Sequence, residues 1–419
     1  MLDIHALRQD PGGIEKRLKS RDPSIELSGI LALDEKRRSL ITLVEERKAE
    51  RNRGSADVGR LKKEGGDAEA LLGRLQALSD EITTLDGELR AVTEQLQSEL
   101  QRLPNIPHPS VPVGEKDDKV ILRTFGDKPE PAFEIRNHVE IGDRLGLFDF
   151  ERAARITGSR FPMYTGRGAL LEMALVSWML RHHAGRGYTP IWPPFVANEQ
   201  SFYVSSQLPK FADEIYYVDK DGLYLNPTAE SLLVNLHREE ILAASELPRK
   251  YVAYTPCFRR EAGSYGEEER GLIRIHQFNK VELFKFCVPE RSYDELDALI
   301  EDAESVLTAL GLHYRVALLS TKDMAQQASK TVDLEVYLPG QGRYYEVSSC
   351  SNCEAFQSRR GAIRYRPDEK AKPEYLHTLN GSGLATPRLV AAILENNQTE
   401  DGRVRIPDVL QEAVGAEWL

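Results

Sequence analysis

At residues 258–284 the chain reads FRREAGSYGEEERGLIRIHQFNKVELF, with two apolar ends around a centre of glycines and charges. This pattern predicts two strands joined by a loop, and alternate side chains of a strand share a face. We therefore expect Arg259 and Glu261 on one face, where Phe278 and Glu282 of the returning strand can join them. Arginine binds phosphate through forked, charge-assisted hydrogen bonds, and an aromatic ring can stack on a purine. The alternative is a charged surface hairpin.

The sequence that flanks this predicted hairpin mixes strand and helix patterns. Residues 331–351 alternate between apolar and polar on both sides of a turn at 339–342, which predicts a second hairpin. Ser292 and Glu295 have the spacing of a capping box and predict the start of a helix. Hairpins separated by single helices indicate an α+β domain, an antiparallel sheet with helices on its faces.

The N-terminal part differs in composition. Residues 31–103 are rich in Leu, Glu, Lys, Arg and Gln and contain no proline. Apolar residues step by three and four, typical of a coiled coil, at Leu78, Ile82, Leu85, Leu89, Val92, Leu96, Leu100 and Leu103. Four glycines at 51–67 predict a tip near residues 52–67, so we expect an antiparallel helical hairpin with arms of roughly 50 Å. The proline-rich stretch 102–114 is a linker, which predicts domains at 1–103 and 104–419.

Charge is unevenly distributed in this hairpin. Residues 31–63 hold ten basic and six acidic side chains, whereas residues 64–100 hold two basic and nine acidic ones. One interpretation is a solvated coiled-coil surface with ion pairs between the helices. The other is an arm that binds a phosphate backbone.

Composition limits the possible classes of function. The 419 residues suggest two or three domains, and the net charge of −11 argues against coating nucleic acid nonspecifically. No apolar run reaches ~18 residues and the start lacks a secretory leader, so we expect a cytoplasmic protein without a membrane span. Cys350 and Cys353 form a C-x-x-C, read as reduced thiols beside a strand, with a redox pair or half a zinc site as the alternatives.

Three further stretches carry candidate site residues. In NPTAES (226–231), Thr228 stands at a helix N-cap position, and Glu230 could receive a substrate ammonium group. In YYEVSSCSN (344–352), Glu346 and Ser348 alternate on one strand face, where both could hold Mg²⁺ near phosphates. In LNGSGLATPR (379–388), a turn of small residues opens a helix whose first-turn Arg388 would favour an anion. Each of these patterns also has an ordinary structural explanation.

Together these segments resemble the seryl-tRNA synthetases, a family of class II aminoacyl-tRNA synthetases, over essentially the whole chain. Residues 258–283 resemble the second motif of the class, and residues 379–398 resemble the third. Residues 186–195 resemble the first, with Pro194 at the motif proline beside a dimer interface. The segments TAE (228–230) and SSCSNCEAFQSRR (348–360) resemble the seryl branch in particular.

The resemblance implies a reaction and a set of site residues. Serine would react with ATP to give seryl-adenylate, and serine would then pass to tRNA(Ser) and, as the family leads us to expect, to tRNA(Sec). Arg259 and Arg388 would be catalytic. The serine pocket would comprise Thr228, Ala229, Glu230, Glu282, Asn380 and Ser382. The ATP site would comprise Arg259, Arg260, Glu261, Arg274, Ile275, Phe278, Glu346, Val347, Ser348, Ser349 and Arg388, with Mg²⁺ on Glu346 and Ser348.

The resemblance also implies partners. The helical arm would lie along the variable arm of the tRNA, the loop Gly263–Arg270 would meet its acceptor end, and the enzyme would be a homodimer. The sequence departs from the family pattern at Ser206 and Lys322, each in place of a usual glycine, and lysine adopts a positive φ only at a cost. These departures leave open a specialised paralogue, tolerant of an inhibitor or biosynthetic, that activates serine or an analogue for another acceptor. A non-enzymatic binding protein would be expected to lose the phosphate-binding arginines, and this chain keeps them.

Overall fold

The structure, a computed structural model, describes residues 1–261 and 271–419. These residues form two compact units, one of Leu2–Pro104 and one of Asn105–Leu419 together with Met1. Among the described residues no helix is long and apolar enough to cross a membrane.

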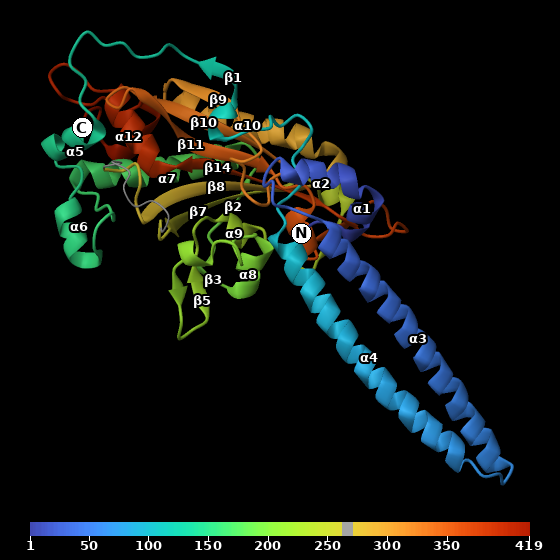
Figure 1. The fold of residues 1–419 in the computed structure, drawn as a ribbon. Helices are drawn as coiled ribbons and strands as arrows, with labels where there is room; N and C mark the ends of the chain where they lie inside the picture. The colour runs from blue at the N-terminus through green and yellow to red at the C-terminus, as the bar shows by residue number, and fades with distance from the viewer. Residues whose placement is uncertain (262–270) are drawn as a thin grey trace. The chain divides into compact units, whose positions relative to one another are not determined.

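The smaller unit is helical. Its helices are α1 (Ile4–Gln9), α2 (Pro11–Lys19), α3 (Ser28–Lys63) and α4 (Glu69–Arg102). Helices α3 and α4 run side by side as a long hairpin (Figure 1), and at 1.5 Å per residue they are about 54 and 51 Å long. The buried side chains of α4 follow the seam expected from the sequence, at Leu78, Ile82, Val92, Leu96 and Leu100. The predicted coiled-coil arm is confirmed.

The tip of the hairpin is shorter than the sequence indicated. The connection occupies only residues 64–68, because α3 continues through Gly54 and Gly59. A Cβ atom on Gly54 would lie 2.7 Å from Cδ2 of Leu75 on α4, so glycine permits close helix packing at this position. The expectation of a break from residue 52 was therefore wrong, because contact with α4 outweighs the low helix propensity of glycine.

Both interpretations of the charge pattern have support. Three ion pairs join α3 to α4: Arg47–Glu81 at 2.8 Å, Lys48–Asp86 at 3.0 Å and Arg74–Glu50 at 2.7 Å. Near the tip, Arg53, Lys62 and Lys63 are exposed, and none forms an ion pair within the described part of the chain. The arm therefore keeps cations available for an anionic partner.

The larger unit is built on an eight-stranded sheet, antiparallel except where β2 pairs with β7 (Figure 1). In spatial order its strands are β1 (Val120–Phe125), β9 (Tyr314–Leu318), β10 (Lys330–Leu338), β11 (Arg343–Asn352), β14 (His377–Ala385), β8 (Gln277–Cys287), β7 (Arg249–Phe258) and β2 (Thr189–Ile191). Two small sheets contain β3 (Val196–Asn198), β5 (Leu223–Leu225) and β4 (Tyr217–Val218), and β13 (Glu374–Tyr375), β12 (Arg364–Arg366) and β6 (Ile241–Ala243).

Alternation along β8 separates the core from the site. Val281 and Leu283 are fully buried in the main core, which contains side chains of α7, α10 and α12. A Leu283→Ala change there would cost about 2–5 kcal/mol of folding free energy. Phe278, Lys280 and Glu282 point to the opposite face, where they line cavities. The predicted α+β fold with helices flanking an antiparallel sheet is confirmed.

The helices of this unit have the following bounds: α5 (His138–Leu145), α6 (Phe150–Thr157), α7 (Gly166–Gly185), α8 (Glu199–Val204), α9 (Glu230–Leu233), α10 (Ser292–Ala309), α11 (Phe356–Arg360), α12 (Thr386–Asn396) and α13 (Asp408–Val414). Helix α10 corrects one expectation. Its N-cap is Arg291 and carries no side-chain cap, so the capping box was wrong. The Ser292 hydroxyl instead accepts a hydrogen bond from Asn352 and contacts the ring of His377.

Candidate active site

Two adjoining cavities of about 260 and 570 Å³ lie on the face of the sheet to which Phe278, Lys280 and Glu282 point, and the first turn of α12 borders the smaller one. The first is lined by Arg259, Glu261, Arg274, Ile275, Phe278, Glu346, Val347 and Arg388, among others. The second is lined by Thr228, Glu230, Glu282, Ser349 and Asn380, among others. The residues that border both cavities are Arg259, Glu261, Arg274, Lys280, Glu346 and Ser382. The structure therefore brings most of the predicted site residues to one place.

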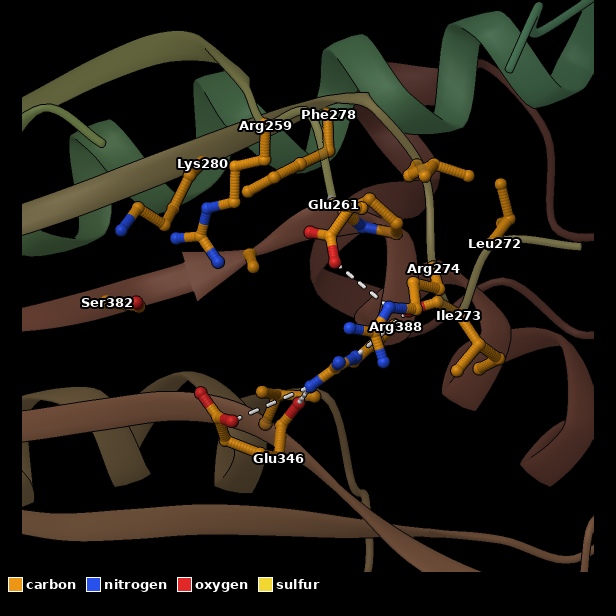
Figure 2. A pocket seen from close by; sticks show the side chains of 14 residues that line it. Arg259, Glu261, Leu272, Ile273, Arg274, Phe278, Lys280, Glu346, Ser382 and Arg388 are labelled. Atoms are coloured by element: carbon orange, nitrogen blue, oxygen red, sulfur yellow. Dashed lines mark hydrogen bonds and ion pairs between the residues drawn. The ribbon is translucent and has the colours of Figure 1, made fainter. Parts of the chain in front are cut away.

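The wall of the first cavity begins where β7 ends (Figure 2). Arg259 continues the ladder beyond the strand, because its amide donates to His276 O at 2.9 Å. Its guanidinium lies over the Phe278 ring at 5.1 Å from the centroid. This cation–π contact holds a cationic group beside an aromatic ring at the cavity wall.

Glu261 lies outside the regular strand. Its backbone has φ +50°, so the expected strand alternation from Arg259 to Glu261 does not apply. The carboxylate nevertheless reaches the same cavity and accepts from Arg274 Nε at 2.9 Å. Arg259 and Glu261 therefore line the same cavity because the chain turns at Glu261, and not because alternate residues of a strand share a face.

Arg388 enters the cavity from the first turn of α12, opposite Arg259 (Figure 2). Its Nη1 donates to Glu346 O at 2.7 Å and lies 3.7 Å from the Glu346 carboxylate. Its Nε donates to Ile273 O at 3.3 Å. Three arginines, Arg259, Arg274 and Arg388, therefore border the first cavity.

The second cavity is dominated by Glu230. Its Oε1 accepts three amide hydrogen bonds, from Gln327 at 3.0 Å, Gln357 at 2.7 Å and Asn380 at 3.1 Å. Burial, followed by repulsion from Glu282, raises the pKa of Glu230 to about 7. A buried carboxylate of this kind is stabilised in its charged form by a cation, such as an ammonium group.

Lys280 is a site residue that our reading of the sequence missed. Its ammonium group donates to Thr228 Oγ1 at 2.6 Å and lies 2.5 Å from Glu282 Oε2. Thr228 Oγ1 in turn donates to Glu282 at 3.0 Å. The signal was available, since Lys280 alternates with Phe278 and Glu282 on β8.

Gln327 and Gln357 were also missed. Gln357 lies in the stretch 348–360, which was noted for its resemblance to the seryl branch, and Gln327 lies five residues after Lys322. Nothing local at either position indicates that the two amides meet at Glu230, which is separated from them by 97 and 127 residues.

Three predicted site residues lie apart from the cavity walls. Ala229 is fully buried at the N-cap of α9. Arg260 is exposed, with its guanidinium 6.0 Å from the Tyr216 ring centroid. Ser348 is buried and donates to Ser382 O at 2.6 Å. The predicted loop contact at Gly263–Arg270 lies outside the described residues.

A β-bulge explains the position of Ser348. Glu346 pairs with Glu335 and Ser348 with Leu334, so Val347 is the extra residue. The bulge reverses the alternation, so Ser349 rather than Ser348 lines the cavity with Glu346. The prediction that Glu346 and Ser348 share a face is wrong.

The cysteines and the two departures from the family pattern have ordinary environments, with one exception. Cys350 and Cys353 are buried free thiols, and burial raises the pKa of both. Lys322 has no positive φ and contacts Glu115, so its backbone avoids the conformation that would cost a lysine free energy. Ser206, in contrast, has φ +73° and a buried hydroxyl without a partner. Of the two departures, Ser206 is therefore the one with a strained backbone.

Comparison with known proteins agrees with this geometry. Residues 215–397 match the tRNA synthetase class II core domain (G, H, P, S and T), and residues 1–107 match the seryl-tRNA synthetase N-terminal domain. The chain therefore contains the core domain of a class II aminoacyl-tRNA synthetase.

Full-length relatives narrow the class to one family. The serine–tRNA ligase of Geobacter sulfurreducens is 51% identical over 99% of both chains, and that of Caldicellulosiruptor saccharolyticus is 51% identical over the full length of both. A crystal structure of seryl-tRNA synthetase from Pyrococcus horikoshii complexed with ATP superposes with a TM-score of 0.94, at 36% identity, and covers 100% of this chain and 99% of that one. The chain belongs to the seryl-tRNA synthetase family.

Proposed function

We propose that this protein activates L-serine with ATP, forming seryl-adenylate and pyrophosphate, and transfers serine to tRNA(Ser) and tRNA(Sec) in the cytoplasm. The observation that carries the proposal is the junction of the two cavities. A cavity bordered by Arg259 and Arg388 opens into one that holds Glu230 and Glu282. ATP and a small ammonium compound would meet at the shared wall.

The first step joins a serine carboxylate oxygen to the α-phosphorus of ATP and breaks the bond to the pyrophosphate oxygen. Arg259, at the junction, would stabilise charge that develops on the α-phosphate. Arg388 would bind the β- and γ-phosphates from the far side of the first cavity. Catalysis then consists of positioning and charge stabilisation, without a protein nucleophile.

Serine would be recognised by opposite charge and hydrogen bonding. Glu230 would receive its ammonium group, because the three amides on Oε1 orient the carboxylate and Oε2 is left for a ligand. Thr228 and Glu282, already hydrogen-bonded to each other, would bind the hydroxyl. Lys280 would place a positive charge near the serine carboxylate.

The residues present fit Mg²⁺, which the family implies. Glu346 and Ser349 line the cavity, and the buried Asp333 behind them has an oxygen atom, Oδ1, without a partner. Burial, with repulsion from Glu346, raises the pKa of Asp333 well above its usual range, as expected for a carboxyl group near other carboxylates. We propose that Glu346 and Ser349 would bind Mg²⁺, which would neutralise part of the charge of the ATP phosphates.

In the second step a hydroxyl of the terminal tRNA ribose attacks the seryl carbonyl carbon and releases AMP. We propose that the arm formed by α3 and α4 in the domain 1–103 binds the variable arm of tRNA, that the loop Gly263–Arg270 meets its acceptor end, and that the domain 104–419 carries out catalysis. The exposed cations Arg53, Lys62 and Lys63 support this role of the arm.

We also propose a homodimer. Met173 and Trp192 are 59% and 71% exposed, and they border an apolar cavity on α7 and the segment after β2. Large apolar side chains exposed together usually mark a contact surface. This is the segment that resembles the first motif of the class.

Serine-dependent ATP–pyrophosphate exchange, compared with other amino acids and followed by charging of a total tRNA pool, tests the proposal. Exchange with serine alone, together with charging of tRNAs that have long variable arms, is expected. Exchange without charging would point to another acceptor, and absence of exchange would refute the activity.

A further inference from the structure

His138, the first residue of α5, lies fully buried against the end of α12. Its Nδ1 is 2.8 Å from Glu395 Oε1, which also accepts from the His138 backbone amide at 3.0 Å. Glu395 Oε2 accepts from Gly340 N at 2.9 Å. The Glu395 carboxylate is therefore surrounded by hydrogen-bond donors. Glu395 belongs to α12, the helix that also carries Arg388.

The other ring nitrogen, Nε2, contacts a residue in the wall of the first cavity, which we call the nucleotide cavity. The amide of Leu272 donates to His138 Nε2 at 3.2 Å. A ring nitrogen that accepts from an amide must be unprotonated, so Nδ1 carries the proton and donates it to Glu395. The hydrogen bonds thus select one neutral tautomer of His138.

Leu272 begins the segment 272–275, all of which lines the first cavity. Its neighbour Ile273 accepts from Arg388 Nε at 3.3 Å. Helix α12 therefore holds this segment twice, through Glu395 and His138 at the Leu272 amide and through Arg388 at the Ile273 carbonyl. Loss of the hydrogen bond between Leu272 and His138 would therefore also change the position of the Ile273 carbonyl, which accepts from Arg388.

Gly271 shows how closely the imidazole and this segment approach. It has φ +69°, and a Cβ atom there would lie 2.5 Å from His138 Nε2 and 2.5 Å from Val139 Cγ2. Neither contact is possible without movement, so the site is built around the unsubstituted backbone.

We propose that His138 is a positioning residue for the nucleotide cavity: by holding the Leu272 amide, it sets the position of the wall 272–275 and of Arg388 relative to ATP. The inference rests on the proposed function for the identity of the nucleotide. It assigns to His138 no contact with substrate.

Two substitutions distinguish the contribution of Nδ1 from that of Nε2. In His138→Gln the side-chain oxygen can reach the place of Nε2 and accept from Leu272. In His138→Asn the side-chain amide can replace Nδ1 toward Glu395, but the Leu272 amide loses its acceptor. Val139→Ala is the matched control, because it alters packing beside Gly271 and leaves both hydrogen bonds.

The measurement is the Kd of ATP by titration calorimetry, with melting temperature and exchange kinetics on the same proteins. We expect His138→Asn to weaken ATP binding about tenfold, since a buried amide is left unpaired. We expect His138→Gln and Val139→Ala to stay within about threefold of wild type, with the KM for serine unchanged in all three.

Wild-type ATP affinity in His138→Asn, or equal losses in all three variants, would overturn the proposal in favour of a packing role. If His138→Asn does not fold, Gly271→Ala gives the same test with the imidazole kept: weaker ATP binding supports the proposal and unchanged binding overturns it. A wild type that binds ATP without serine-dependent exchange would refute the proposed function alone, and the calorimetry would still decide the role of His138.

Discussion

The raised pKa of Glu230 predicts that serine binding depends on pH in the neutral range. Only the ionised carboxylate attracts the serine ammonium group. With a pKa of about 7 in the free site, where burial and then Glu282 disfavour the charge, the ionised fraction is about 0.9 at pH 8 and about 0.1 at pH 6. The KM for serine should therefore rise about tenfold as the pH falls from 8 to 6.

The raised pKa of Glu230 also affects the stability of the folded protein. Serine binding is favoured at high pH, whereas this contribution to stability is greatest at low pH. A carboxyl group whose pKa is raised in the folded state binds a proton more tightly there than in the unfolded chain. Its stabilising contribution is complete below the ordinary value of 4.5 and is lost as the pH rises through about 7. From pH 4 to pH 8 the loss amounts to about 3 kcal/mol. Serine should offset it, so serine should raise the melting temperature more at pH 8 than at pH 6.

The assay is ATP–pyrophosphate exchange at saturating ATP, with serine varied at each pH between 6 and 8.5. The KM for ATP at saturating serine, measured over the same range, controls for general effects of pH. Glu230→Gln should weaken serine binding at least about 100-fold, as loss of a buried charge partner implies, and should remove the pH dependence of the remainder.

A flat wild-type KM for serine would refute the reasoning. A carboxylate with an ordinary pKa near 4.5 is already about 97% ionised at pH 6. The KM for serine would therefore change by only a few per cent between pH 6 and pH 8. That result would mean that water or the amides around Oε1 offset the burial of Glu230.

Four further predictions test separate parts of the protein. Arg259→Ala should reduce kcat/KM for exchange about 100- to 1,000-fold, because a group that stabilises charge at phosphorus is lost; a change under tenfold would contradict this role. Ser349→Ala should raise the Mg²⁺ concentration that gives half-maximal exchange, whereas Ser348→Ala should not, as a magnesium titration of both would show. Ser206→Gly should stabilise the protein by about 1 kcal/mol in denaturant unfolding, because glycine relieves the positive φ and removes an unpaired hydroxyl. Trp192→Glu should convert the dimer to a monomer in sedimentation analysis, and a wild type that is already monomeric would refute the proposed contact.

The sequence alone was sufficient for the helical arm and for the chemical character of the site. Heptad spacing is a local property, so Leu78, Ile82 and Val92 could be assigned to the seam without any knowledge of the partner helix. The arginines and carboxylates of the site were recognisable from the resemblance of residues 258–283 and 379–398 to the class II motifs, whereas the residue types alone also fitted an ordinary charged surface.

Only the tertiary structure decided which side chains meet. Ser349 replaces Ser348 at the cavity because of the bulge at Val347, and a bulge exists only in the pairing of β11 with β10. Gln327 and Gln357 converge on Glu230 from distant parts of the chain, so no local pattern records their contact. Periodicity depends on residues three or four apart, whereas strand register and buried hydrogen bonds depend on which segments pack together, and packing is determined by the whole chain.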